Sequence, residues 1–546
     1  MVHVLTELTK YLVIILFAVY TLSSFTVLFR KSNPDRENRI YIRQSVCMYV
    51  LHFLCHLVIF AVEQKWSIWA LYLGEVGLTL VIFLIYRIIY KNADRLIVHH
   101  MCMLMLIGFS ELARLDLDAA LHQFEVAILA VAITAFVPRI VVHAHFIRKL
   151  TWLYGVIGIL VLGAVLVLGS VTYGAKITFT VAGITLQPSE LIKIIFVFFV
   201  ACRLYRSTAF KDVVITTIAA ALHVIILVLS SDLGAALIFF VTYICMLFVA
   251  TRAPVYLLGG FGVGAVAAFG ASKVFNHVKT RVSAWKDPFA NIEGGGYQVA
   301  QAMFAIGTGG WFGLGLYQGM PETIPVETSD FIFAAIAEEF GGIFAICIIL
   351  VCLSCFIMLT RVARQIHDVF YQMIALGFGV AYGTQVFLNI GGVIKFIPST
   401  GVTLPFISYG GTSIFCTVVI FAIIQGIYIL RHNENEIHVE NFDLEQDEVI
   451  PVRRNEGGAE EVLRRHMNQP QSTERARTTK QTAKPAGREA EQPKKAAGRG
   501  TEQPKKTRRP QVTQEEIEGF WDEEKDRVQK TRRKNKRSQT EYEEKW

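Results

Sequence analysis

Apolar blocks alternate with short polar segments over residues 11–430 of this chain. Each block is roughly 18 to 25 residues long, which is enough for a helix to cross a bilayer core about 30 Å thick. The pattern predicts about thirteen membrane spans and an all-α polytopic membrane protein. The predicted spans are residues 11–29, 44–61, 66–86, 97–112, 120–141, 152–171, 191–205, 213–229, 233–250, 254–271, 331–359, 370–394 and 406–430.

Lys and Arg residues concentrate in every second loop between these spans. Short cytoplasmic loops are enriched in Lys and Arg, so this alternation predicts which loops face the cytoplasm. It places the N-terminus outside, the segment after the last span inside, and the large loop at 273–330 on the extracytoplasmic face. The basic residues are Arg30, Lys31, Arg36, Arg39, Arg43, Arg87, Lys91, Arg95, Arg139, Arg148, Lys149, Arg203, Arg206, Lys211, Arg252, Arg361 and Arg364.

The composition changes abruptly after the last span. An acidic patch is followed by a long segment rich in Lys, Arg, Glu, Gln and Pro, which cannot bury enough apolar surface to fold. We expect residues 432–546 to form a disordered, charged cytoplasmic tail. The tail is either a solvated low-complexity segment or an electrostatic tether to anionic lipid or an acidic partner. Aromatic residues are not interleaved with its charges, so nucleic-acid binding is not expected.

Familiar metal and nucleotide motifs are absent from the sequence. The nine cysteines fall in the apolar spans without metal-ligand spacing to histidines, so we expect free thiols. The glycine runs at 294–296 and 307–315 lack the preceding strand and the following Gly-Lys-Ser/Thr of a phosphate-binding loop.

Carboxylates at the edge of one span are the first candidates for chemistry. Asp330 immediately precedes the span at 331–359, at the boundary between water and lipid, where keeping a charge costs free energy. Glu338 and Glu339 follow inside that span, and Glu338 would lie approximately on the same helix face as Asp330. One helix could therefore present two acids to the same hollow. The alternative is that Asp330 only caps its helix.

Two other polar clusters open predicted spans. Glu190 and Lys193 lie three residues apart and could pair on one helix face. Pro188 and Ser189 before them also suit the first turn of a helix, so a structural role is equally open. Asp232 likewise suits a helix N-cap.

Six motifs taken together resemble the SEDS proteins, the FtsW/RodA/SpoVE family, over residues 97–430. The resemblance implies a ten-helix, GT-C-like membrane glycosyltransferase core at 96–431. About three additional N-terminal helices at 1–95 lie outside the resemblance. The motifs are Gln187-Pro188-Ser189-Glu190-x-x-Lys193, Asp232-Leu233-Gly234, Gly296-Tyr297-Gln298, Ala305-Ile306-Gly307-x-Gly309-Gly310-x-x-Gly313, Asp330-Phe331-Ile332-Phe333 with Glu338-Glu339-x-Gly341, and Leu404-Pro405-x-x-Ser408-Tyr409-Gly410-Gly411.

The resemblance implies a bacterial cytoplasmic-membrane enzyme that polymerises lipid II into peptidoglycan glycan strands. The transfer would be inverting and would release undecaprenyl pyrophosphate, in division, sporulation or cell-shape wall synthesis. Expected partners are a class B penicillin-binding protein and other divisome or elongasome proteins. Thr403-Leu404-Pro405 leans toward the division and sporulation branch, although a Lys found before Gly-Leu-Thr-Leu-Pro in some division members is Thr400 here. The His and one Glu of the family's Pro-Glu-x-His-Thr-Asp also have no direct match before Asp330.

The resemblance makes Asp330 the catalytic base candidate. Positive charge for the departing pyrophosphate could come from basic side chains or from a divalent metal such as Mg²⁺ or Mn²⁺. The predicted substrate-binding residues are Glu322, Arg281, Lys193, Glu190, Gln298, Glu338, Ser408 and Tyr409.

Two other classes of function remain open at this point. A flippase or transporter of a lipid-linked precursor would also use many helices and buried carboxylates. Such a protein would carry charges in the middle of several spans and internal symmetry, and the sequence shows neither. A non-catalytic division scaffold that recruits enzymes through its tail and extra spans is the third possibility.

Overall fold

The computed structural model describes residues 2–29, 34–143, 145–172, 175–181, 184–291 and 295–448, and helices dominate this part of the chain. The α-helices are α1 (Val2–Phe29), α2 (Pro34–Glu63), α3 (Ser67–Ile88), α4 (Arg95–Leu115), α5 (Leu117–Thr134), α6 (Val137–His143), α7 (Thr151–Leu168), α8 (Pro188–Arg206), α9 (Phe210–Leu229), α10 (Leu233–Thr251), α11 (Pro254–Val274), α12 (Asn276–Lys286), α13 (Tyr297–Gly309), α14 (Ile332–Glu339), α15 (Gly341–Gln365), α16 (Val369–Val393) and α17 (Gly411–Glu448). Short 3₁₀-helices are η1 (His145–Lys149), η2 (Phe289–Asn291) and η3 (Pro321–Thr323).

Twelve stretches of helix in the described residues are long and apolar enough to cross a membrane, and the chain is a multi-pass membrane protein. They correspond to twelve of the predicted spans. The remaining prediction corresponds to α8, which has the length of a span but carries Glu190, Lys193, Arg203 and Arg206. The predicted span at 331–359 is divided into two helices, because the helical backbone is interrupted between α14 and α15. α15 begins at Gly341, whose φ is +87°.

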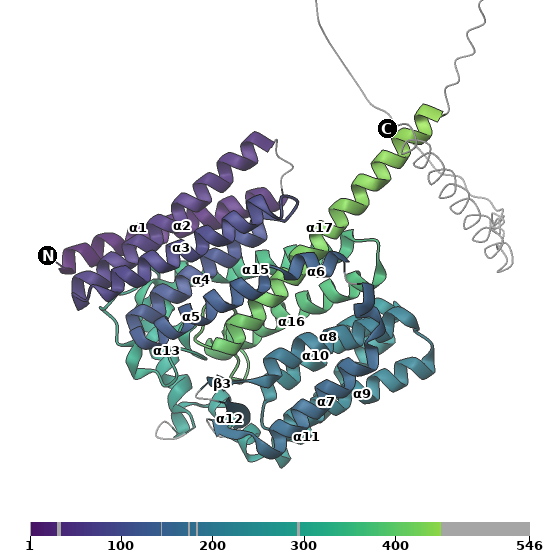
Figure 1. Cartoon of the computed structure of the whole chain (residues 1–546). Coiled ribbons are helices and arrows are strands. Elements are labelled where there is room, and N and C mark those ends of the chain that lie inside the picture. The colour runs from purple at the N-terminus through teal and green to yellow at the C-terminus, as the bar shows by residue number, and fades with distance from the viewer. Residues whose placement is uncertain are drawn as a thin grey trace, which may run out of the picture. The chain divides into compact units, whose positions relative to one another are not determined.

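The first three helices form a group that packs on the rest of the bundle (Figure 1). α1 packs against α15, while α2 and α3 pack against α4. As a result, the whole 18-residue apolar stretch of α4 is buried inside the protein. By contrast, α11 packs mainly on α10 and has no fully buried residue. α4 is therefore an interior helix of the bundle, and α11 lies at its edge.

Three short strands were not predicted. β1 (Ser170–Thr172), β2 (Ala175–Val181) and β3 (Ile184–Leu186) form an antiparallel sheet in the order β1-β2-β3. The sheet follows α7, which ends at Leu168, three residues before the end of the predicted span at 152–171. This segment alternates β-branched residues with others, which favours strands over a continued helix.

The last helix extends beyond its predicted end. α17 continues to Glu448, so residues 432–448 are helical where a disordered tail was expected. The remainder of the predicted tail, residues 449–546, lies outside the described residues.

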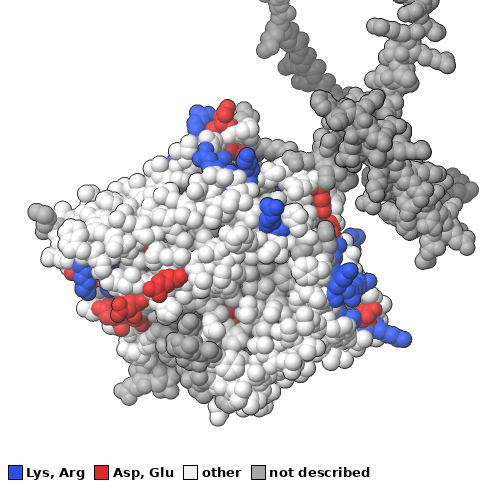
Figure 2. Space-filling view, in the orientation of Figure 1, with Lys and Arg blue, Asp and Glu red and all other residues white. Residues whose placement is uncertain are grey.

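Charged side chains on the visible face gather toward the two ends of the helices, with a nearly uncharged band between them (Figure 2). Lys and Arg predominate at the end from which α17 leaves the bundle. This distribution is typical of a protein whose apolar band is surrounded by lipid, because a charge costs free energy in the bilayer core.

Candidate functional site

Asp330 is tied to α16 through its backbone. Its backbone oxygen accepts a hydrogen bond from Nδ2 of Asn389, at 3.0 Å. The same Nδ2 atom donates to the backbone oxygen of Val402, at 2.7 Å. Asn389 therefore ties the turn before α14 to the loop that precedes α17, and the candidate base lies at their junction.

Arg281 of α12 contacts the same loop before α17. Its Nη1 donates to the backbone oxygen of Ser399, at 3.0 Å. Gly401 has a φ of +73°, and a Cβ built there would lie 3.3 Å from Nη2 of Arg281 and 3.4 Å from Oδ2 of Asp330. The glycine is needed for both reasons: its backbone conformation is left-handed, and its missing side chain leaves room for the two charged groups.

The surroundings of Asp330 suit it to accept a proton. Burial raises the pKa of Asp330 to about 6, the nearby Arg281 guanidinium opposes that rise, and the carboxylate of Asp232 adds to it. Asp232 caps α10 by accepting from the backbone N–H of Ala235 at 3.0 Å, as predicted, and accepts from the hydroxyl of Ser189 at 2.9 Å. Burial also raises the pKa of Asp232.

Ser408 and Tyr409 contact the chain immediately before Asp330. The hydroxyl of Ser408 donates to the backbone oxygen of Ser329 at 2.6 Å and accepts from the backbone N–H of Leu404 at 2.8 Å. The backbone N–H of Tyr409 donates to the backbone oxygen of Thr328, at 2.8 Å. These bonds position the approach to Asp330. Substrate binding by the two residues remains a prediction.

Glu190 and Lys193 pair with each other, as their spacing predicted. Nζ of Lys193 lies 2.8 Å from Oε2 of Glu190 and 2.7 Å from Oε1 of Gln385. Nε2 of Gln385 in turn donates to the backbone oxygen of Thr403, at 3.1 Å. Both charged side chains are largely buried, so this chain of bonds braces α8 and α16 against the loop before α17.

Glu338 and Glu322 belong to a second cluster. Arg114 of α4 donates through Nε to Oε1 of Glu339 at 3.0 Å, and its Nη2 lies 3.6 Å from Oε2 of Glu322. Oε1 of Glu338 accepts from the backbone N–H of Met320, at 3.1 Å. Glu322 therefore lies beside Arg114, and the side chain of Glu338 binds the loop before η3. Asp330 instead has Arg281 and Asp232 as its charged neighbours.

Close backbone approach builds this second cluster. The backbone N–H groups of Leu314 and Gly315 donate to the backbone oxygens of Glu338 and Glu339, at 2.9 and 2.8 Å. A Cβ at Gly313, whose φ is +74°, would lie 2.2 Å from the backbone oxygen of Glu339. The glycine-rich run is therefore a packing device that lets the turn after α13 lie against the end of α14.

One predicted residue stands apart from both clusters. Gln298 is exposed on α13 and has no hydrogen-bond partner in the described part of the chain. Its predicted contact with substrate remains a prediction.

Four residues in or near these clusters were missed by the sequence reasoning, among them Glu111, which interacts electrostatically with Arg114 and Glu339. Glu111 and Arg114 come from α4, and Gln385 and Asn389 come from α16. Glu111 carried a usable signal, because it is an acid inside the predicted span at 97–112 and such residues commonly face a functional interior. The amides of α16 carried none, since uncharged polar residues are common in membrane helices.

An apolar groove runs beside Arg281. It has a volume of about 1990 Å³ and is lined by side chains of α9, α10, α11, α15 and α16. Arg281, Ser399 and Thr400 lie on its wall, beside the loop that Asp330 faces. The arrangement joins a long apolar surface to a cation and a carboxylate.

The sequence profile of the FtsW/RodA/SpoVE family, described as cell cycle protein, matches residues 92–433. The chain belongs to this family. The predicted family is therefore confirmed, and the FtsW/RodA/SpoVE match begins after α3, consistent with a three-helix N-terminal extension.

Relatives within the family include the peptidoglycan glycosyltransferase RodA of Mycobacterium bovis, 34% identical over 270 residues. That match covers 46% of this chain and 58% of the relative, so the chain spans little more than half the length of such RodA relatives. A probable peptidoglycan glycosyltransferase FtsW of Saccharophagus degradans is 29% identical over 370 residues, which cover 64% of this chain and 95% of that protein.

A solved structure shares the fold. It concerns the coordination of polymerization and crosslinking by a peptidoglycan synthase complex, and one of its chains superposes with a TM-score of 0.53 at 22% identity. The superposition covers 62% of this chain and 98% of that one.

Proposed function

We propose that this FtsW/RodA/SpoVE protein is a peptidoglycan glycosyltransferase that polymerises lipid II into glycan strands. The observation that carries the proposal is the apolar groove that Arg281 helps to line, with Asp330 close to the same guanidinium at Gly401. Such a groove suits a polyprenyl chain, and the adjoining charges suit the pyrophosphate and the sugar. The glycosyltransferase names of the family relatives support the same reading.

In the proposed reaction, Asp330 removes a proton from the 4-hydroxyl of an acceptor GlcNAc. The hydroxyl oxygen then forms a bond to the anomeric carbon of MurNAc, and the bond from that carbon to undecaprenyl pyrophosphate breaks. The electron pair of the broken bond leaves with the pyrophosphate. Attack from the face opposite the leaving group inverts the anomeric configuration.

The proposed chemistry needs one base rather than a pair of acids. Pyrophosphate is already a good leaving group, unlike the sugar hydroxyl that a glycoside hydrolase must protonate. A base with a pKa of about 6 is largely ionised at neutral pH and can still accept a proton. Arg281 lies on the wall of the groove, where it can stabilise charge on the departing phosphates.

The proposed membrane orientation places the candidate site on the extracytoplasmic face. The predominance of Lys and Arg at the α17 end of the visible face supports a cytoplasmic assignment for that end (Figure 2). The N-terminus would then lie outside, in the bacterial cytoplasmic membrane. A class B penicillin-binding protein and divisome or elongasome proteins would be the partners, since the similar solved chain comes from a peptidoglycan synthase complex.

Purified full-length protein tests the proposal through glycan-strand formation from lipid II. The assay is run with and without a class B penicillin-binding protein and with and without Mg²⁺ or Mn²⁺, because the metal requirement is itself a prediction. Wild type should form polymer, and Asp330→Asn should lower the rate by at least about 10²-fold. Asp287→Asn is the matched control, because Asp287 is an exposed residue that caps the turn after α12 and an amide keeps its hydrogen bonds.

Other outcomes would overturn the proposal. Full activity of Asp330→Asn would remove Asp330 as the base. Movement of lipid II across vesicles by folded protein that makes no polymer would favour a flippase. Neither activity, in protein that still binds its partner, would favour a division scaffold.

A further inference from the structure

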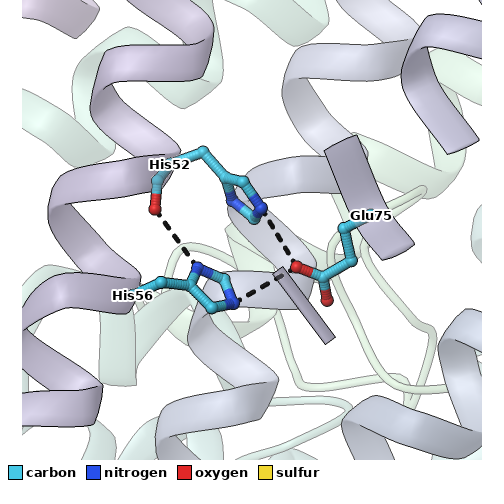
Figure 3. A group of neighbouring side chains, drawn as sticks. All are labelled: His52, His56 and Glu75. Carbon is cyan, nitrogen blue, oxygen red and sulfur yellow. Dashed lines mark hydrogen bonds and ion pairs between the residues drawn. The ribbon is translucent and has the colours of Figure 1, made fainter. Parts of the chain in front are cut away.

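A histidine pair and a carboxylate meet inside the N-terminal extension, outside the family match. His52 and His56 lie one turn apart on α2, and Glu75 faces them from α3 (Figure 3). Oε2 of Glu75 lies 3.0 Å from Nε2 of His52 and 3.2 Å from Nε2 of His56. All three side chains are fully buried. A bare carboxylate in this position would be costly, so the cluster needs a positive charge.

The hydrogen bond at Nδ1 of His56 shows where that positive charge is needed. Nδ1 of His56 lies 3.2 Å from the backbone oxygen of His52, which can only accept, so Nδ1 carries the proton. In a neutral imidazole the other nitrogen, Nε2, then has a free lone pair. That lone pair points at the Glu75 oxygen, which is also an acceptor. Two acceptors in contact repel unless a cation lies between them.

The remaining atoms of the cluster also lack ordinary partners. Nε2 of both histidines and both carboxylate oxygens of Glu75 have no hydrogen bond within the described residues. Oε2 of Glu75 lies 3.0 and 3.2 Å from the two Nε2 atoms, which is close to the edge of a tetrahedron around a zinc ion, about 3.3 Å for ligand bonds of 2.0–2.1 Å. The three atoms all lie within 4.8 Å of one another, so one ion can contact all of them.

The outer nitrogens of the rings are oriented as in metal centres. Metal-binding histidines usually donate their second N–H to a carbonyl or another fixed acceptor, which sets the ring orientation. His56 has the His52 carbonyl, and Nδ1 of His52 lies 2.9 Å from the hydroxyl of Ser110 on α4. Histidines four residues apart on one helix, joined by a glutamate, form a common zinc ligand set.

We propose that His52, His56 and Glu75 bind a divalent transition metal ion of the zinc class. The ion would join α2 to α3 and, through Ser110, fix both helices to α4, the buried helix that also carries Glu111. The extension would thereby be fastened to the family core by a metal centre. This centre is separate from the groove and from Asp330, so the proposal does not depend on the glycosyltransferase assignment.

Metal content of the full-length protein is the direct test. The protein is produced in zinc-supplemented medium, purified without chelators and measured by mass spectrometry for bound metal. Wild type should hold about one equivalent of zinc, and Co²⁺ loaded in its place should show the visible absorption of a tetrahedral complex. Glu75→Gln and His56→Gln should each lose at least about tenfold in bound metal. The apparent Tm should rise with zinc in wild type and not in these two variants.

A histidine outside the cluster provides the control. His99 on α4 is buried and its Nδ1 also faces a backbone oxygen, that of Arg95 at 2.7 Å, but its Nε2 faces the Ser45 hydroxyl rather than a carboxylate. His99→Gln should therefore keep the metal. His56→Cys should restore binding, with a sulfur-to-cobalt charge-transfer band in the Co²⁺ form. Folded wild type that takes up neither zinc nor cobalt would overturn the proposal and leave a proton as the cation shared by the cluster.

Discussion

Arg281 and Asp330 both lie beside the Cα of Gly401, next to the space that a side chain would fill. Nη1 and Nη2 of Arg281 and Oδ2 of Asp330 lie within 3.4 Å of the position where a Cβ would stand. The described residues nevertheless contain no ion pair between them, so Oδ2 of Asp330 is not occupied by the guanidinium. The base is close enough to the cation to feel its field and remains free to accept a proton from substrate.

Gly401→Ala should therefore disturb the site directly. The left-handed backbone at this position costs an alanine roughly 1 kcal/mol, and the new methyl group would press on both charged groups. We expect the polymerisation rate to fall by at least about tenfold while the protein still accumulates in the membrane. Gly77→Ala on α3 is the control, because a Cβ there meets nothing within 4 Å. Equal activity of the two variants would contradict the prediction.

The pH dependence of the reaction should report the surroundings of Asp330. Because burial raises the pKa of Asp330 to about 6, the reactive carboxylate is lost as pH falls through that value. The kcat/KM for lipid II should fall about tenfold per unit below the midpoint and level off above it. Asp232→Asn removes a neighbouring negative charge and should move the midpoint down.

Arg281→Gln should move the same midpoint in the opposite direction. The guanidinium holds the pKa of Asp330 down, so its removal favours the protonated acid and shifts the midpoint above 6. The kcat should also fall if Arg281 stabilises the leaving group. pH–rate profiles of Asp232→Asn and Arg281→Gln, measured beside Asp287→Asn, separate a shift of the midpoint from a fall in kcat. The kcat can change while the midpoint stays the same. Coincident midpoints in all variants would remove Asp330 as the titrating base.

Local patterns predicted what depends on neighbours in sequence. Apolar blocks located the spans, and a spacing of three residues correctly paired Glu190 with Lys193. The junction at Gly401 depends on groups from α12, the turn before α14 and α16, which only the tertiary fold brings together. Nothing in their spacing indicates that they meet.

The same limit explains the grouping of the acids. Helical periodicity suggested that Asp330 and Glu338 share a hollow, but Asp330 lies in the turn before α14 begins. The glycine-rich turn after α13 packs against Glu338 and Glu339, whose side chains contact different partners. The histidine pair on α2 has visible spacing, whereas its carboxylate comes from α3, so the sequence alone did not connect them.

Removing one partner of the buried ion pair of α8 should lower the stability of the protein more than removing both. Lys193→Met would leave Glu190 without a cation in a largely buried position, at a cost of about 3 kcal/mol or more. The double variant Glu190→Gln with Lys193→Met should be more stable than Lys193→Met alone, because no charge is then stranded. Apparent Tm values of wild type, Glu190→Gln, Lys193→Met and the double variant in one detergent measure the coupling. Additive effects of the two substitutions would show that the pair is not coupled.

Glu339 should make the stability of the protein depend on pH. It lies before the span α15, and burial raises its pKa, while Arg114 opposes the rise. A carboxyl with a raised pKa takes up a proton on folding, so its contribution favours the folded state below its unfolded pKa and is lost as pH rises through the folded pKa. The apparent Tm should therefore decline over this range in wild type.

Two substitutions test this assignment. Glu339→Gln removes the titrating group and should flatten the decline in apparent Tm between about pH 5 and pH 8. Arg114→Gln removes the opposing cation, which should raise the pKa of Glu339 further and carry the decline to higher pH. The exposed Glu322 is the control, because Glu322→Gln removes a carboxylate 3.6 Å from the same guanidinium but leaves Glu339 paired. A decline that persists unchanged in Glu339→Gln would assign it to another group, such as Glu111, whose two carboxylate oxygens have no hydrogen bond within the described residues.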